Sequence, residues 1–202
     1  MSENDNSVNI HSEKNRYHHG DLRTALIDEG LKLINAGRAD ALSLREIARN
    51  AGVSATAVYR HFPDKAALLG ALCLEGHVRM AGAFERAMAS AAPGVEAFSA
   101  MGRAYVRFAL AHPALFRLMM AQTTGPVPAP PPLAGAGTGA DSMQMLVNAI
   151  DGLFGADTPP AAREARRLQA WSLVHGLAML MLDGQVPADP ALVDAVVDAR
   201  IL

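Results

Sequence analysis

The chain has 202 residues, of which 50% are apolar, and a formal net charge of −2 at pH 7. This length and apolar content provide one or two modest domains with cores of their own, and because no uninterrupted apolar run of about 18 residues occurs, we expect no membrane span. The polar start MSENDNSVNIHSEKNR lacks the apolar segment of a secretory signal, and Cys73, the single cysteine, cannot form an internal disulfide, so we expect a reducing, cytoplasmic location.

The first two predicted helices are separated by recognisable end signals. Apolar residues at helical spacing predict a helix over residues 21–36, which Gly37 can end. Ser43 and Glu46 then form the Ser-x-x-Glu pattern of a capping box, which predicts that a short second helix begins just after Ser43. Gly52 can adopt the left-handed backbone conformation that lets the chain turn after that helix.

The next two helices follow after short connections. Ser54 can cap a third helix, which we expect to run to about Phe62 because Pro63 cannot continue it. Asp64 can cap a long fourth helix over residues 65–91.

The remainder of the chain also shows helical patterns. Further helices are expected over residues 95–111, 113–122, 141–154, 160–182 and 190–201. Residues 124–140 contain five Pro and four Gly, which predicts an irregular, mobile loop. Because no strand pattern is convincing, the predicted fold class is all-α.

Residues 44–62 are predicted to form two short helices joined by a three-residue turn. Ala48, Gly52 and Val58 lie at offsets of four and ten residues, the spacing of a helix-turn-helix. A small residue is needed at Ala48, where the second helix crosses the first, and Val58 packs the two helices together. The outward face of the second helix is then free to enter a DNA major groove. The alternative is a plain helical hairpin inside a bundle.

The residues around this motif favour DNA binding over the alternative. Tyr59, His61 and Lys65 place hydrogen-bond donors where they can reach phosphates beside a groove. Residues 14–65 carry nine Lys or Arg against six Asp or Glu, whereas residues 66–202 carry nine against eleven. This asymmetry indicates an N-terminal part that meets an anion.

The segment LREIARNAGVSATAVYRHFPDKAALL (44–69) resembles the DNA-binding segment of TetR-family transcriptional regulators, and the likeness extends back through YHHGDLRTALIDEGLKLI. Such proteins are all-α homodimers, usually repressors that a small-molecule effector releases from a palindromic double-stranded DNA operator. The resemblance implies a flexible polar tail (1–15), a three-helix helix-turn-helix DNA-binding domain (16–64) and a helical ligand-binding and dimerisation domain (65–202).

The resemblance also assigns roles within the predicted DNA-binding surface. The phosphate-binding positions are Ser43, Tyr59, His61 and Lys65; the base-facing positions, after the cap Ser54, are Ala55, Thr56 and Ala57; and Arg45 is a further DNA contact. Methyl groups and one hydroxyl cannot make a bidentate contact to guanine. We therefore expect Arg45, an N-terminal arm with His18 and His19, or DNA shape to share the reading of sequence.

The segment WSLVHGLAML is similar to the Trp-x-x-x-His-Gly signature of one subgroup of TetR C-terminal domains. Trp171 and His175 share a helix face, and Gly176 lets another helix approach closely. The last helix has two apolar stripes, formed by Leu192, Val196 and Ala199 and by Val193, Val197 and Ile201. Two such C-terminal helices per subunit predict a four-helix homodimer interface. The alternative is that both helices only close the core of one subunit.

The resemblance implies an apolar effector cavity in the C-terminal part. The candidate ligand-binding residues are Phe98, Met101, Tyr105, Phe108, Phe116, Met120, Met143, Trp171 and His175. Tyr105 and His175 are the expected polar groups inside it, and methionine side chains adapt to ligands of varied shape. A stripe of such residues is also compatible with plain core, and the loop over 124–140 can either cover the entrance or serve as a linker.

Other functions have less support from the sequence. Cys73 and His77 lie four residues apart, as a nucleophile and a base can, but no orienting acid or oxyanion feature accompanies them, so we expect no enzyme. A redox regulator that senses through Cys73 and a helical binding module without DNA function remain alternatives. The histidines show no zinc-ligand spacing, so we expect no metal, no cofactor and no membrane partner.

Overall fold

The computed structural model describes residues 22–38, 42–121, 142–155 and 158–198, apart from the side chain of Met143. Within these ranges all regular secondary structure is helical, which confirms the all-α prediction. The helices are α1 (Leu22–Asn35), α2 (Leu44–Asn50), α3 (Ala55–Tyr59), α4 (Lys65–Ala89), α5 (Val95–Ala111), α6 (Pro113–Ala121), α7 (Ser142–Phe154), α8 (Pro160–Leu182) and α9 (Pro190–Val196). The predicted tail (1–15), the arm at His18 and His19 and the loop over 124–140 lie outside the described residues.

The predicted end signals shape the first half of the chain. Ser43, Ser54 and Asp64 each accept a hydrogen bond from the backbone N–H three residues further on, at 3.1, 3.2 and 2.8 Å. These side chains satisfy N–H groups that a helix start leaves without a partner. Gly37 and Gly52 follow α1 and α2 with φ angles of +70° and +68°, a backbone conformation that favours glycine.

Two details of the N-terminal part differ from the prediction. α3 ends at Tyr59 rather than at about Phe62, and residues 60–61 form a turn. The reason is Pro63, which disfavours the helical conformation in the residue before it. The capping box is also only half formed, because the carboxylate of Glu46 binds Arg49, at 2.5 Å.

The last helix is shorter than predicted. It ends at Val196, whereas the apolar pattern had predicted a helix to residue 201. Val197 leaves the helical conformation with φ −92° and ψ 79°. Its carbonyl oxygen accepts a hydrogen bond from Arg103 Nε at 3.1 Å, so a side chain of α5 takes the place of the next helical N–H.

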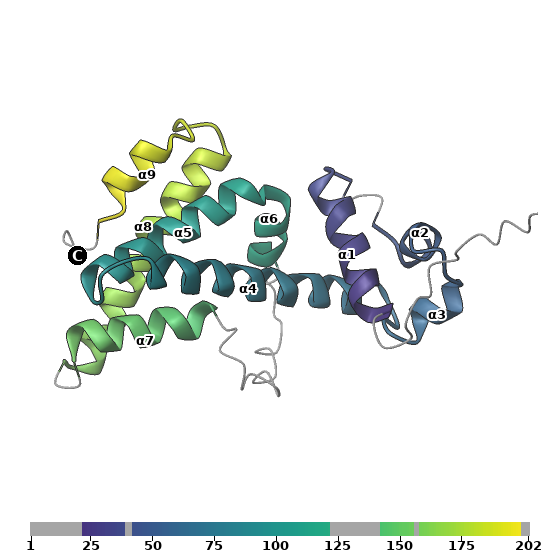
Figure 1. Ribbon diagram of the computed structural model, residues 1–202, viewed down its shortest axis with the longest axis horizontal. Helices are drawn as coiled ribbons and strands as arrows, with labels where there is room; N and C mark the ends of the chain where they lie inside the picture. Colours follow the sequence, from purple (N-terminus) through teal and green to yellow (C-terminus); the bar gives the residue numbers. More distant parts are fainter. Residues whose placement is uncertain (1–21, 39–41, 122–141, 156–157, 199–202) are drawn as a thin grey trace, which may run out of the picture.

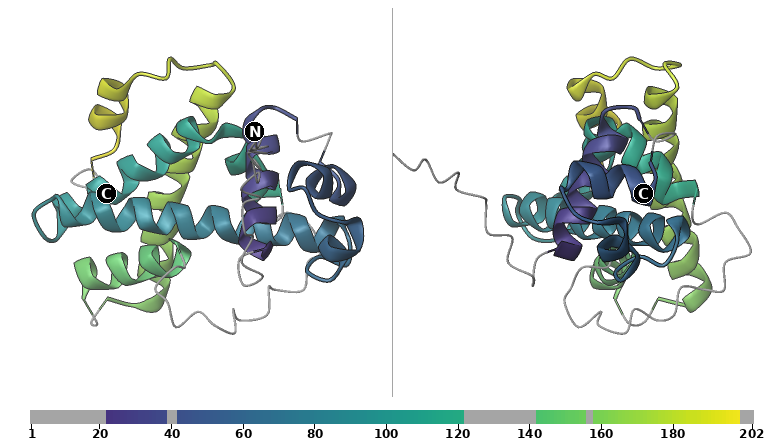
Figure 2. Two further views of the ribbon diagram at one scale, coloured as in Figure 1. Left: turned by 45° about the vertical axis from the view of Figure 1, so that its right-hand side comes forward. Right: turned by 90° about the vertical axis from the view of Figure 1, so that its right-hand side faces the viewer.

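The long helix α4 joins the two parts of the molecule (Figure 1). α1, α2 and α3 lie around its N-terminal end, and the later helices gather around the rest of it. α5 folds back along α4, and α8 runs across both, from α7 on one side to α9 on the other (Figure 2). The chain therefore has an N-terminal helix-turn-helix domain and a helical C-terminal domain that share one continuous helix.

The junction between the two parts is closely packed at two glycines of neighbouring helices. A Cβ on Gly30 of α1 would lie 2.9 Å from Leu72 of α4, and a Cβ on Gly76 of α4 would lie 2.6 Å from Met119 of α6. α6 also contacts α1. Because α1, α4 and α6 meet pairwise, a displacement of α4 or α6 reaches the helix-turn-helix domain directly.

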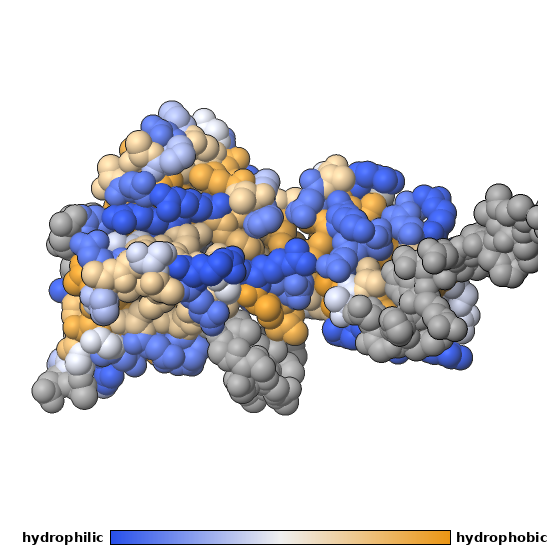
Figure 3. Space-filling view, viewed as in Figure 1, coloured by the Kyte–Doolittle hydropathy of each residue, from blue (hydrophilic) through white to orange (hydrophobic). Residues whose placement is uncertain are grey.

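The surface differs between the two ends of the molecule. On the face in Figure 3, hydrophilic side chains predominate around α1 to α3, whereas more of the C-terminal domain is covered by apolar residues. Among the described helices, none combines the length and the apolar character that crossing a bilayer requires.

Candidate nucleic-acid interface and an apolar cavity

The helix-turn-helix is held together by the residues that its spacing predicts. Ile47 and Val58 are fully buried and Ala48 is 4% exposed, so α2 and α3 meet through small and branched side chains. The turn is closed by a hydrogen bond from the Val53 N–H to the Ala48 carbonyl at 3.0 Å. This packing fixes the angle between the two helices and leaves the other face of α3 open to solvent.

Most of the predicted DNA-binding residues are exposed. The exposed ones are Ser43, Arg45, Ser54, Ala55, Thr56, Tyr59, His61 and Lys65. Ala57 is half-buried, which leaves Ala55 and Thr56 as the more accessible part of the expected base-facing surface. Tyr59 is 47% exposed, so its side chain is accessible to a partner.

The two serines serve the fold and remain available for a further contact. Ser43 Oγ and Ser54 Oγ each accept a hydrogen bond from a backbone N–H group. A hydroxyl that accepts one hydrogen bond still carries its own proton, which it can donate to a phosphate oxygen. Lys65 begins α4, so the expected phosphate-binding cation belongs to the helix that joins the two domains.

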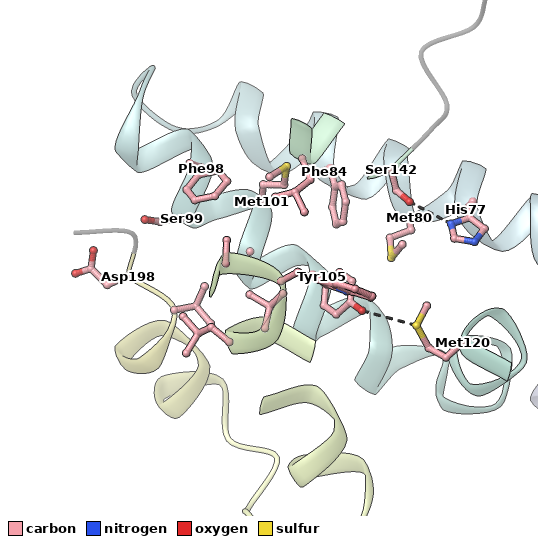
Figure 4. Close-up of a pocket in the computed structure, with 17 residues that line it drawn as sticks. His77, Met80, Phe84, Phe98, Ser99, Met101, Tyr105, Met120, Ser142 and Asp198 are labelled. Atoms are coloured by element: carbon pink, nitrogen blue, oxygen red, sulfur yellow. Dashed lines mark hydrogen bonds between the residues drawn. The ribbon is translucent and has the colours of Figure 1, made fainter. Parts of the chain in front are cut away.

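An apolar cavity of about 150 Å³ lies inside the C-terminal domain, between α4, α5, α6, α7, α8 and the end of α9 (Figure 4). Of the predicted ligand-binding residues, those that line it are Phe98, Met101, Tyr105, Met120 and Trp171. Asp198 and Ser99 lie at one end of the cavity and His77 with Ser142 at the other, with aromatic and methionine side chains between them.

The other predicted ligand-binding residues take different positions. Phe108 packs against the ring of His112, with ring centroids 4.9 Å apart, away from the cavity. Phe116 and His175 do not line the cavity but contact Tyr105, which does. The ring of Phe116 meets that of Tyr105 edge-on, with ring centroids 5.5 Å apart. The side chain of Met143 lies outside the described residues. Helical spacing alone does not separate a cavity wall from the core behind it.

Several lining residues were not among the predicted ones. They are His77, Met80, Phe84, Ser99, Gly102, Ser142, Leu146, Ala170, Leu173, Val174, Val197 and Asp198. His77, Met80 and Phe84 of α4 could have been predicted together, because offsets of three and seven residues place them on one helix face. The small residues carried none, since Ser, Gly and Ala are common at any helix crossing.

The polar groups at the cavity are paired with one another. Tyr105 Oη lies 3.0 Å from His175 Nδ1, and His77 Nδ1 lies 3.1 Å from Ser142 Oγ. Burial raises the pKa of the Tyr105 phenol to about 12 and lowers the pKa of His175. Both directions favour the uncharged forms, so the Tyr105–His175 pair is neutral at pH 7.

The predicted dimer helices divide into two roles. On α8, the side chains of Leu168, Trp171 and Leu180 are 50%, 37% and 40% exposed. Val193 of α9, and Val197 directly after it, are buried inside the subunit, so these two residues belong to the core of the subunit itself, as in the alternative interpretation. The exposed apolar residues of α8 are therefore the stronger candidates for contact with a second subunit.

The α9 helix is fastened to α5 by charged groups. Asp194 binds Arg107 at 2.5 Å and lies 3.6 Å from Arg103. A Cβ on Gly102 would lie 2.8 Å from the side chain of Val197, so the glycine permits this close approach. Residues 199 and 201, which complete the two predicted stripes, lie outside the described residues.

The residues considered for other chemistry are Cys73 and His77. Cys73 is half-buried, and burial raises the pKa of its thiol, which disfavours the reactive thiolate. His77 is directed to Ser142. In the described part of the chain, no group of three or more His, Cys, Asp or Glu side chains could hold a metal ion.

These features define a class: helix-turn-helix transcription regulators with a helical C-terminal domain. Residues 98–201 match the family model described as "Tetracyclin repressor-like, C-terminal domain", and residues 26–72 match "Bacterial regulatory proteins, tetR family". Because the first match spans just over half of the chain, the chain belongs to the TetR family of bacterial transcription regulators. The resemblance of residues 44–69 to this family is thereby confirmed, whereas the Trp-x-x-x-His-Gly subgroup signature stays a prediction.

Solved structures agree with this assignment. A protein of unknown function from Rhodococcus sp. RHA1 is 34% identical, with a TM-score of 0.71 over 91% of this chain and 93% of that one. A TetR-family transcriptional regulator from Streptomyces coelicolor is 24% identical, with a TM-score of 0.66 over 90% and 79%. The multidrug binding protein EbrR, solved in complex with imidazole, is 17% identical, with a TM-score of 0.60 over 87% and 92%. The last two support the fold alone. No curated protein matches the chain.

Proposed function

We propose that this regulator is a homodimeric repressor that binds a palindromic DNA operator and leaves it when a small apolar or amphipathic effector enters the cavity. The observation that carries the proposal is that α4 belongs to both sites. Its first residue, Lys65, is exposed and is one of the predicted phosphate-binding residues, and His77, Met80 and Phe84 line the cavity. A molecule in the cavity therefore touches the helix that positions the predicted DNA-binding surface.

The DNA-binding part of the proposal divides phosphate contacts from base contacts. Tyr59, His61 and Lys65 supply donors at the end of α3 and the start of α4, where phosphate contacts would set the orientation on the duplex. Thr56 offers the one hydroxyl on the exposed front of α3, beside methyl groups that suit thymine. Arg45 at the start of α2 adds a guanidinium that can take either role.

Release would follow from a displacement of α4 between two subunits. Adjacent major grooves on one face of DNA are about 34 Å apart, so the two α3 helices must keep that separation. Gly76 holds α4 tightly against Met119 of α6, and the next residue of α6, Met120, lines the cavity. An effector that prefers a different arrangement of α4 and α6 would lower operator affinity, by about 1–3 kcal/mol for typical couplings.

A dimer is required for this mechanism, and α8 supplies a suitable face. The apolar side chains of Leu168 and Trp171, three residues apart, are exposed on neighbouring positions of it. Two copies of α8 packed about a twofold axis would bury these residues and give the operator its palindromic symmetry.

The proposal is tested by binding to the DNA that flanks the gene, measured in a salt series. If Arg45 and Lys65 of both subunits each neutralise one phosphate, the logarithm of the association constant falls with that of salt concentration with a slope of roughly −3 to −4. The variant Lys65→Ala should reduce the slope, and Arg117→Ala, which removes a cation of α6 that is paired with Asp183, is the control that should not. Salt-independent binding, or no binding to any DNA, would reject the proposal.

A further inference from the structure

The charge of the cavity wall restricts what can enter it. Among the described lining residues there is no lysine and no arginine, and the one acidic side chain, Asp198, lies at an end of the cavity beside Ser99 (Figure 4). A carboxylate or phosphate inside would lose its hydration and would meet at most one imidazole, that of His77, which is already directed to Ser142. An ammonium group is not disfavoured in the same way, because aromatic ring faces attract cations and Asp198 carries a carboxylate.

The size of the cavity restricts the effector further. Its volume is about 150 Å³. An apolar cavity of that size in another protein takes up benzene, so about one six-membered ring with a small substituent fits the space. Phe84, Phe98 and Trp171 offer ring faces and edges around it.

One polar position can orient such a molecule. Tyr105 lines the cavity, and its hydroxyl lies 3.0 Å from His175 Nδ1, behind the wall. If the tyrosine donates to the histidine, its oxygen can accept from a ligand; if the histidine donates, the tyrosine O–H can donate to a ligand. The pair can thus satisfy one hydroxyl or one carbonyl group while both residues stay neutral.

We propose that the effector is a molecule of about one aromatic ring, without an anionic group, that carries a single hydroxyl or carbonyl group hydrogen-bonded to Tyr105. This inference rests on the proposed function, because it names the chemical class of the molecule that would act at the same cavity. It excludes carboxylates and phosphates as effectors, and it excludes molecules with two or more fused rings.

The test uses three one-ring probes of nearly equal shape: benzyl alcohol, toluene and benzoate, titrated into the full chain without DNA by calorimetry at pH 7. Benzyl alcohol should bind at least about tenfold more tightly than benzoate, because a carboxylate loses its hydration in the cavity. Naphthalenemethanol, with two rings, should bind more weakly than benzyl alcohol. Equal or tighter binding of benzoate or of the two-ring probe, or no binding of any probe, would overturn the inference.

Two kinds of variant locate the binding. Tyr105→Phe should weaken the binding of benzyl alcohol about three- to tenfold, the usual contribution of one hydrogen bond. The same variant should change the affinity for toluene less than twofold. Ala170→Phe places a ring in the cavity and should abolish the binding of both toluene and benzyl alcohol. Ala165→Phe, at an exposed position of the same helix α8, should leave both affinities unchanged. If Ala170→Phe does not fold, Val174→Phe fills the cavity from a half-buried position. Equal losses for toluene and benzyl alcohol in Tyr105→Phe would contradict the assigned hydrogen bond.

The design separates the inference from the proposed function. A chain that binds its operator but none of the one-ring probes would refute this effector class and leave the DNA-binding regulator intact. A chain that binds benzyl alcohol in the predicted order but binds no DNA would refute the regulator proposal. In a chain that does both, benzyl alcohol should lower operator affinity and the Ala170→Phe variant should not respond to it.

Discussion

Replacing one of two glycines in α4 by alanine should have opposite effects on stability, depending on which glycine is replaced. Gly70 and Gly76 both lie inside α4, six residues apart. A Cβ added at Gly70 would meet no heavy atom within 4 Å, whereas one added at Gly76 would lie 2.6 Å from Met119 Sδ and 3.2 Å from Leu115 Cδ1. Met119 is fully buried, so it has little room to move aside. The pair therefore tests whether α4 and α6 pack as described.

The magnitudes follow from two known terms. Replacing glycine by alanine inside a helix gains about 1 kcal/mol, because alanine loses less backbone entropy. At Gly70 this gain stands alone, so Gly70→Ala should raise the free energy of unfolding by about 1 kcal/mol. At Gly76 the same gain is opposed by an overpacking cost of about 1–3 kcal/mol. Gly76→Ala should therefore be less stable than Gly70→Ala by about 1–3 kcal/mol.

Urea denaturation followed by circular dichroism measures this difference, with all proteins at one concentration because a dimer's stability depends on concentration. For a chain of this length, 1 kcal/mol corresponds to a shift of about 2–4 °C in the melting temperature, which provides an independent check. If Gly76→Ala stabilised the protein as much as Gly70→Ala, the close contact between α4 and α6 would be wrong, and with it the proposed route from the cavity to the DNA-binding domain.

Three further predictions concern the cavity, a helix cap and the DNA surface. Because burial raises the pKa of Tyr105 from 10 to about 12, the stability contributed by its neutral form is complete below pH 10 and is lost progressively as the pH rises from 10 to 12, by about 1 kcal/mol per pH unit. Urea titrations at pH 9 to 11.5 should show this loss relative to Tyr105→Phe, and parallel profiles would contradict it. Ser54→Ala should lower the free energy of unfolding by about 1 kcal/mol, because the backbone N–H of Ala57 loses its hydrogen-bond partner. In the same denaturation assay, Ser54→Asp should keep the original stability. A Ser54→Ala protein of unchanged stability would show that the cap contributes nothing. Tyr59→Ala should weaken binding to all DNA sequences by a similar factor, whereas Thr56→Ala should change which sequence binds best; DNA-binding titrations on a panel of single-base variants would refute this division if both variants gave the same pattern.

The helices and their ends were largely predictable because the signals are local. Ser43, Ser54 and Asp64 cap the helices that their positions predicted, and Gly37 and Gly52 provide the expected left-handed turns. Such signals depend on neighbouring residues only, so one sequence is enough to read them. The helix-turn-helix itself was predictable for the same reason, since its spacing is fixed within about twenty residues.

The errors arose where distant residues decide the structure. The last helix ends early because Arg103, more than ninety residues away, binds the carbonyl of Val197. Phe108 and Tyr105 share the apolar pattern of α5, yet only Tyr105 faces the cavity. Asp198 and Ser142 reach the cavity wall through contacts between helices, which no local pattern records. The position of each lining residue therefore depends on how α4, α5 and α8 cross.

The central claim is that the exposed face of α2, α3 and the start of α4 reads a palindromic operator. It is tested most directly by letting the protein select its binding site from a pool of random double-stranded DNA and sequencing the bound fraction. If this face reads such an operator, the bound fraction should contain an enriched inverted repeat whose half-sites are centred about 34 Å apart, one turn of the double helix or a multiple of it. A variant with Tyr59→Ala and Lys65→Ala should lose the enrichment. A pool without any enriched sequence, or an enrichment that this double variant retains, would contradict it.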